Sequence, residues 1–330
     1  MATLYVTKPG ARIEKHYHQL LVTHQDEILM TVPLARVSDV VLVGQVGVTT
    51  PALHSLLRHG VGLTLLSRGG GLIGRLRPPG GGHLALRQAH YARGLDAAFC
   101  LCFARSVVNG KLRNCRTLAR RIARKVSVDS RPLQRLDEAI GAIGTAADLA
   151  ALRGIEGSGT RAYFRILAAA LPPEMPFERR TRRPPGDPIN AMLSLGYVLL
   201  TTNLIAALEI VGLDPYDGFF HADKYGRPAL ALDLVEEFRP VIADSVVLTL
   251  VNKRIVTPGD FEPRSNGAVG LTRRGLRQFL KEYTRRVNTP IVHPAAGRAL
   301  TYQKIFEVQA RALRKVIEGE RQDYRPFRIR

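Results

Sequence analysis

The sequence lacks the paired cysteines that a disulfide framework or a structural zinc site requires. Three cysteines occur in 330 residues, Cys100, Cys102 and Cys115, an odd number without a CxxC pair. Cys100 and Cys102 stand in the middle of an apolar helical segment, so we expect small buried thiols in a reducing cytosol. A GxxxxGKS or GxxxxGKT motif is also absent, which leaves nucleotide hydrolysis without support.

Acidic residues are scarce relative to basic ones. Asp and Glu total 28, whereas Lys and Arg total 48, which gives a formal net charge of +20. This excess predicts a polyanionic partner, for which nucleic acid and an anionic membrane surface are the two candidates. The sequence shows no signal peptide, because residues 1–6 have the pattern of a strand, and it has no internal repeat or low-complexity tail.

One segment, residues 189–208, has no charged side chain and is long enough to cross a bilayer. It contains several polar residues, however, among them Asn190, Thr201, Thr202 and Asn203. Polar side chains are costly in lipid, so a buried core helix is the better interpretation of this segment.

Short apolar and β-branched runs separated by turn residues predict a β-rich first domain. The expected strands cover residues 3–7, 19–23, 28–33, 40–43, 61–66 and 71–76. One helix is expected over residues 50–58, because Thr50 can cap it and Pro51 suits its first turn.

A Pro- and Gly-rich run at residues 78–82 ends this pattern and predicts a linker between domains at 1–77 and 83–330. The second domain is predicted to be helical, because Ala, Leu and Arg recur at helical spacing while Pro and Gly fall between the segments. The expected helices cover residues 85–126, 131–150, 157–170, 188–212, 232–252, 272–286 and 299–318. The predicted fold class is α+β, with a small N-terminal β-sandwich-like domain followed by a large all-α C-terminal domain.

Basic residues gather in two clusters. The first occupies one face of the first long helix and consists of Arg113, Arg116, Arg120 and Arg124. The second lies in a Pro-rich loop and consists of Arg179, Arg180, Arg182 and Arg183. Each cluster alone is compatible with ordinary solvated surface. Two clusters on a chain of this net charge favour contact with the phosphates of a nucleic acid.

Three acids interrupt an otherwise apolar helical sequence, Asp233, Glu236 and Glu237. Their spacing of three and four residues places carboxylates on one helical face, and His221 stands in a turn upstream. Carboxylates near a buried surface need a cation, so these residues predict a divalent metal site. A salt-bridge cluster is the alternative, because Arg239 can pair with one of the acids. Pro240, if helical, is expected to kink the helix beside the site.

A second acidic signal is Glu156, which stands among glycines that allow a close approach of the backbone. We expect it at the start of a helix. A carboxylate there is also explained by simple stabilisation of the helix N-terminus, so the role of Glu156 stays open on the residues alone.

The order of these motifs resembles a known family. Glu156-Gly157 followed by Tyr163-Phe164, then His221, then the run from Asp233 to Pro240 is similar to the CRISPR-associated adaptation endonuclease, the integrase subunit of spacer acquisition. The resemblance covers nearly the whole chain, including the order of a β-rich and a helical domain.

The resemblance implies that Glu156, His221 and Glu236 are catalytic and ligate Mg²⁺ or Mn²⁺, with Asp233 as a nearby catalytic acid that supports the site. Glu237 leaves open which carboxylate binds the metal. The implied reaction is the insertion of spacer DNA into a CRISPR array, in adaptive antiviral defence, by attack of a 3′-hydroxyl on a phosphodiester. The same site would act as a nuclease if water were the nucleophile.

The implied partners are double-stranded DNA, as spacer precursor and repeat array, and a small companion adaptation protein. A homodimer joined through the β-rich domain, a cytoplasmic location in a prokaryote and no membrane are also implied. Three alternatives stay open. They are a metal-dependent nuclease of branched or double-stranded DNA without an integrase role, a non-catalytic architectural DNA-binding protein, and, more distantly, a membrane-surface protein.

Overall fold

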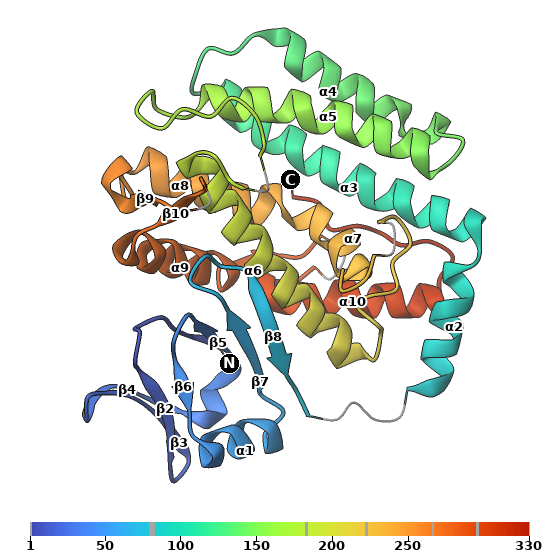
Figure 1. Ribbon diagram of the computed structural model, residues 1–330. Coiled ribbons are helices and arrows are strands. Elements are labelled where there is room, and N and C mark those ends of the chain that lie inside the picture. Colours follow the sequence, from blue (N-terminus) through green and yellow to red (C-terminus); the bar gives the residue numbers. More distant parts are fainter. Residues whose placement is uncertain are drawn as a thin grey trace. The chain divides into compact units, whose positions relative to one another are not determined.

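The computed structural model describes residues 2–78, 83–181, 184–221, 224–265, 267–294 and 297–329. The chain forms two compact units, Met1–Gly82 and His83–Arg330 (Figure 1). The first is rich in strands and the second is mainly helical, so the α+β class is confirmed.

The N-terminal unit contains two four-stranded sheets and one helix. Its elements are β1 (Ala2–Val6), β2 (Arg12–His16), β3 (Gln19–His24), β4 (Glu27–Pro33), β5 (Val37–Val43), β6 (Gly47–Val48), α1 (Thr50–Arg58), β7 (Gly62–Leu66) and β8 (Leu72–Leu76). One sheet has the order β1-β5-β7-β8, in which β1, β5 and β7 are parallel and β8 is antiparallel to β7. The other has the order β4-β3-β2-β6.

Both sheets contribute to one apolar core. Ile13 and Leu20 come from one sheet, Val40 and Leu42 from the other, and Leu56 from α1. Helix α1 covers the residues expected for it, although its cap is Thr49, whose side chain accepts from the Ala52 N–H. Strands β2 and β6 were not expected, because β2 carries mostly charged residues and β6 is only two residues long. The sandwich-like arrangement itself stays a prediction.

The second unit contains nine α-helices in its described residues. They are α2 (Leu84–Gly94), α3 (Ala97–Ala123), α4 (Ser130–Ala142), α5 (Leu149–Ala169), α6 (Pro188–Val211), α7 (Ala229–Phe238), α8 (Ser245–Asn252), α9 (Arg273–Val287) and α10 (Tyr302–Ile317). The prediction of an all-α domain is wrong in one respect. Two antiparallel ribbons of three-residue strands also occur, β9 (Phe261–Pro263) with β10 (Val269–Leu271) and β11 (Pro290–Val292) with β12 (Ala299–Thr301). Strands this short leave no periodic pattern in a sequence.

Aspartate caps divide two of the helices that were predicted as continuous. The Asp96 carboxylate accepts from the N–H groups of Ala98 and Phe99 and starts α3. The Asp148 carboxylate accepts from the Ala151 N–H and starts α5. Glu156 therefore lies inside α5, and the expectation that it begins a helix is wrong. Simple stabilisation of a helix start no longer explains it.

Helix α6 is the core helix of the second unit. It is long and apolar enough to cross a membrane, but 72% of its most apolar window is buried within the protein, as expected. Of the three cysteines, Cys100 and Cys115 are buried, whereas Cys102 is exposed, so the prediction of a buried thiol is wrong for Cys102.

The predicted helix over 232–252 is interrupted at Pro240. Residues Pro240–Asp244 form a π-helical turn between α7 and α8. Proline has no N–H to donate, so the regular helical ladder is broken at this point, next to the acids of α7.

Candidate active site

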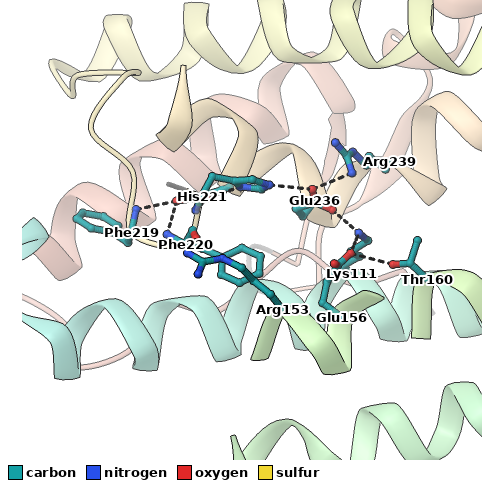
Figure 2. Close-up of polar contacts among 10 residues, drawn as sticks. Lys111, Arg153, Glu156, Thr160, Phe219, Phe220, His221, Glu236 and Arg239 are labelled. Carbon is teal, nitrogen blue, oxygen red and sulfur yellow. Dashed lines mark hydrogen bonds and ion pairs between the residues drawn. The ribbon is translucent and has the colours of Figure 1, made fainter. Parts of the chain in front are cut away.

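Four side chains from separate parts of the second unit meet in one place (Figure 2). Lys111 comes from α3, Glu156 from α5 and Glu236 from α7, and His221 comes from the segment before α7. Helix α3 packs against both α5 and α7, which brings their side chains together across its surface. Close approach of α5 depends on Gly159, because a Cβ atom there would lie 2.9 Å from Leu112 of α3.

Asp233 holds the segment that carries His221. Its carboxylate is completely buried and accepts backbone N–H groups from Phe219, Phe220 and His221 at 2.8, 3.0 and 2.9 Å. The same carboxylate lies 2.7 Å from His221 Nδ1. Because a carboxylate with three backbone donors acts as an acceptor, Nδ1 is the ring nitrogen that donates to Asp233, and Nε2 is the ring nitrogen left to face the site.

His221 Nε2 faces Glu236. The distance from Nε2 to Glu236 Oε1 is 3.6 Å, and the histidine side chain keeps 18% of its surface exposed. An imidazole whose Nδ1 is fixed by a carboxylate and whose Nε2 points toward another carboxylate has the orientation typical of a metal ligand.

Lys111 lies between the two glutamates (Figure 2). Its Nζ contacts Glu156 Oε1 and lies 2.6 Å from Glu236 Oε2. Arg239 pairs with the other oxygen of Glu236 at 2.8 Å, so the pairing that the sequence allowed is present. The Thr160 hydroxyl donates to Glu156 at 2.9 Å.

The charges of this cluster keep both glutamates ionised. Burial opposes ionisation, but Arg239, Lys111 and His221 together lower the pKa of Glu236 to about 2. Burial likewise opposes ionisation of Glu156, yet Lys111 outweighs it and lowers the pKa of this group. The pKa of Lys111 is raised by Glu236 and Glu156 against the effect of its own burial. Two carboxylate anions are therefore available at neutral pH.

Glu237 does not join this cluster. Its carboxylate accepts from Tyr324 Oη at 2.7 Å and from the Phe327 N–H at 2.5 Å, and Gln309 Nε2 lies 3.4 Å away. The expectation that all three acids share one face is wrong for Glu237, because adjacent helical residues point about 100° apart. Glu236 is the carboxylate that lies beside His221.

The donor set fits a hard divalent cation in type. Two ionised carboxylates and an imidazole nitrogen are ligands that Mg²⁺ and Mn²⁺ accept. In the described part of the chain, however, no three His, Cys, Asp or Glu side chains stand close enough to hold an ion as they are. The positive charge between the glutamates is supplied by Lys111.

The first basic cluster lies on α3 and its C-terminal end, and its members have different surroundings. Arg116 pairs with Asp137 at 2.9 Å, and Arg120 lies 3.6 Å from the same carboxylate. Arg113 donates to Asn109, whereas Arg124 is exposed. The cluster is thus partly neutralised by an acid on α4.

The second basic cluster is only partly described, since Arg182 and Arg183 lie outside the described residues. Arg179 is exposed. Arg180 instead points inward, donating to Asn190 Oδ1 at 2.7 Å and Ser194 Oγ at 2.8 Å and stacking 5.3 Å from the Tyr197 ring. Its guanidinium therefore has a structural role in this arrangement.

Sequence reasoning missed Lys111 and a basic groove. Lys111 follows Ala104 and Val107 on the apolar stripe of α3, and a lysine on such a stripe signals buried acidic partners. The groove lies between α4 and α5, has a volume of about 400 Å³, and includes Arg135, Arg161 and Arg165 in its wall. In the sequence, the groove is indicated by Arg161 and Arg165, whose spacing of four residues places both on one face of α5.

Comparison with known proteins decides the family. The family model for CRISPR associated protein Cas1 matches residues 4–285. The chain belongs to the Cas1 family. The resemblance found in the sequence is thereby confirmed.

Several relatives share this assignment. A CRISPR-associated endonuclease Cas1 of Thermus thermophilus is 39% identical over 100% of this chain and 98% of its own length. A Cas4 exonuclease/Cas1 endonuclease fusion of Rhodospirillum rubrum is 40% identical over 96% of this chain, which spans only 56% of that fusion. Among solved structures, a Cas1 protein from Thermotoga maritima has a TM-score of 0.84 with 22% identity, covering 98% of each chain, and so shares the fold.

Proposed function

We propose that this chain is a metal-dependent DNA endonuclease and integrase that inserts spacer DNA into a CRISPR array. The observation that carries the proposal is the meeting of Glu156, Glu236 and His221 at one partly buried site, with Nε2 of His221 directed at Glu236. Membership of the Cas1 family, in which relatives are named endonucleases, supports the same reading.

Glu156, Glu236 and Nε2 of His221 would hold Mg²⁺ or Mn²⁺. The bound ion would supply polarisation of the scissile phosphate and stabilisation of charge on the attacking and leaving oxygens. Asp233 fixes the His221 ring through Nδ1, so that Nε2 is the nitrogen that would face the ion. Arg239 helps to keep Glu236 ionised through its contact at 2.8 Å, and its fixed positive charge would favour an anionic phosphate near the site. The attacking group is a DNA 3′-hydroxyl, so no covalent bond to the protein forms.

Double-stranded DNA is the proposed substrate, both as spacer precursor and as repeat array. The net charge of +20 and the arginine-lined groove beside α5 favour contacts with its phosphates. A structural neighbour is described as a casposase bound to integration product, and another as part of a Cas6-RT-Cas1–Cas2 complex. These descriptions support DNA and a small companion protein as partners.

A homodimer formed through the N-terminal unit is also proposed. Strand β4 lies at a sheet edge and exposes three consecutive apolar side chains, Ile28, Leu29 and Met30. Exposed apolar residues on an edge strand are typical of a surface that another chain covers. Replacing Ile28 and Met30 with glutamate should convert the dimer to a monomer in light scattering.

One reaction tests the main proposal. The protein and its companion are incubated with a 3′-hydroxyl DNA duplex and a supercoiled plasmid that carries a repeat array, in Mg²⁺, Mn²⁺ or EDTA. Metal-dependent joining is expected, and His221→Ala should abolish joining while duplex binding remains. Cleavage without joining would instead indicate a nuclease, and binding without either reaction would indicate an architectural protein.

A further inference from the structure

Lys111 stands where the two glutamates of the candidate metal site converge. Its side chain is 3% exposed, and its ammonium contacts Glu156 and lies 2.6 Å from Glu236 Oε2. We infer that Lys111 is an internal competitor of the divalent metal: its ammonium binds the same two carboxylates and has to leave them when the metal binds. This inference rests on the proposed function.

The carboxylates need a cation in order to approach one another. Two ionised carboxylates in a buried site repel strongly unless a positive charge lies between them. Glu236 has a second cation, Arg239, on its other oxygen. Among the residues that the structure describes, Glu156 pairs with no second cation. Its Oε1, which Lys111 contacts, also accepts a hydrogen bond from the neutral hydroxyl of Thr160. The ammonium is therefore the group that holds Glu156 and Glu236 together.

A small cavity beside Lys111 provides an alternative position for its ammonium group. Lys111 forms part of the wall of a small cavity of about 20 Å³, together with Asp244, Tyr163, Tyr197 and Arg239. The carboxylate of Asp244 accepts from both tyrosine hydroxyls at 2.8 Å and contributes a negative charge to this wall. A lysine side chain has four rotatable bonds, so rotation of the side chain toward Asp244 is the route by which the ammonium would leave the glutamates.

The test measures Mn²⁺ binding rather than activity. Full-length wild type, Lys111→Met and Lys125→Met are titrated with Mn²⁺ by calorimetry, and each is melted with and without the ion. Lys125 is an exposed residue just after α3, so its variant removes the same charge elsewhere. Lys111→Met is expected to bind Mn²⁺ at least roughly tenfold more tightly than wild type, because one positive charge within a few ångströms is removed.

Lys111→Met should also melt at a lower temperature than wild type without metal and regain stability with Mn²⁺. Lys125→Met should match wild type in both measurements. If Lys111→Met binds Mn²⁺ no more tightly than wild type does, or more weakly, the inference is wrong. If the methionine variant is insoluble, Lys111→Gln replaces it with the same expected direction, because it also removes the charge.

Failure of the inference and failure of the proposed function give different results. His221→Ala serves as the reference for binding at the proposed site. If wild type binds Mn²⁺, His221→Ala does not, and Lys111→Met binds as tightly as wild type, the metal site is supported. In that case only the competition between Lys111 and the metal is refuted. Absence of Mn²⁺ binding in wild type and Lys111→Met removes both proposals.

Discussion

His221 and Asp233 are joined twice through one oxygen atom. Asp233 Oδ1 accepts the backbone N–H of His221 at 2.9 Å and lies 2.7 Å from its ring nitrogen Nδ1. One buried carboxylate thus fixes both the backbone and the ring of the histidine. The other oxygen, Oδ2, accepts the N–H groups of Phe219 and Phe220 and completes the turn.

Replacing Asp233 with asparagine is predicted to weaken metal binding about 10- to 100-fold, as expected for a residue that orients a ligand. An amide cannot accept on both of its polar atoms, so either the turn or the Nδ1–H contact is lost. Mn²⁺ titration of Asp233→Asn against wild type measures this. Unchanged affinity would show that Asp233 does not orient His221.

Neighbouring acids on α7 are predicted to respond differently to the same substitution. Glu236→Gln should abolish metal-dependent strand transfer, because this carboxylate lies beside His221 and Lys111. Glu237→Gln should retain strand transfer, because its carboxylate contacts Tyr324 and the Phe327 N–H instead. Burial raises the pKa of Glu237 to about 8, so a neutral amide resembles its state at neutral pH. Parallel joining assays check both, and equal loss in the two variants would contradict the assignment.

Arg179 and Arg180 provide a second matched pair. Arg179→Ala is expected to weaken duplex binding and to reduce the slope of log affinity against log salt by about one, since one exposed charge is lost. Arg180→Ala is expected to lower the free energy of unfolding by about 1–3 kcal/mol, because Asn190 and Ser194 lose their donor. Fluorescence anisotropy and urea unfolding separate the two effects. Wild-type stability in Arg180→Ala would refute the structural role.

The arginine-lined groove between α4 and α5 gives another salt-dependent prediction. Neutralising Arg161 and Arg165 together should reduce the salt slope of duplex binding by about two, since both guanidinium groups are exposed on one side of α5. Metal affinity should stay at the wild-type value. An unchanged slope would mean that DNA does not enter this groove.

Asp244 predicts a specific dependence of stability on pH. Burial raises its pKa from 3.8 to about 6, although hydrogen bonds from Tyr197 and Tyr163 oppose the shift. The folded protein therefore holds this proton more tightly than the unfolded chain. This contribution to stability is present below pH 3.8 and is lost as the pH rises through 6, on the order of 3 kcal/mol in total.

Asp244→Asn should not show this decrease in the free energy of unfolding as the pH rises, because asparagine does not titrate. Urea unfolding of wild type and Asp244→Asn across this pH range should give a difference in unfolding free energy that shifts in favour of the variant as the pH rises. A difference that stays constant with pH would contradict the raised pKa of Asp244.

The sequence grouped Asp233, Glu236 and His221, which the structure also brings together, because their spacing is local. Asp233 and Glu236 are three residues apart, and His221 is 12 residues before Asp233. Glu156 was selected for its glycine neighbours, yet its place in the helix was misjudged because the Asp148 cap eight residues earlier was overlooked. Local patterns thus gave the residues but not always their surroundings.

Contacts between distant segments could not be predicted from the sequence. Lys111 lies 45 residues before Glu156, and no helical period relates the two. Glu237 is the same type of residue as Glu236, and its partners Tyr324 and Phe327 lie 87 and 90 residues later in the chain. Short strands such as β2 were missed because charged residues on the exposed face hide the alternation of a strand.

The hydrogen bond from the Phe327 N–H to Glu237 bears on the order of events during translation. This contact spans 90 residues, and Asn114 of α3 is bonded to both the Phe327 carbonyl and the Ile329 N–H. A ribosome must therefore release α8, α9 and α10 before α7 and α3 gain these bonds. Until then Glu237 on α7 and Asn114 on α3 lack these partners, so the final packing of the two helices is completed only after the segment around Phe327 has emerged.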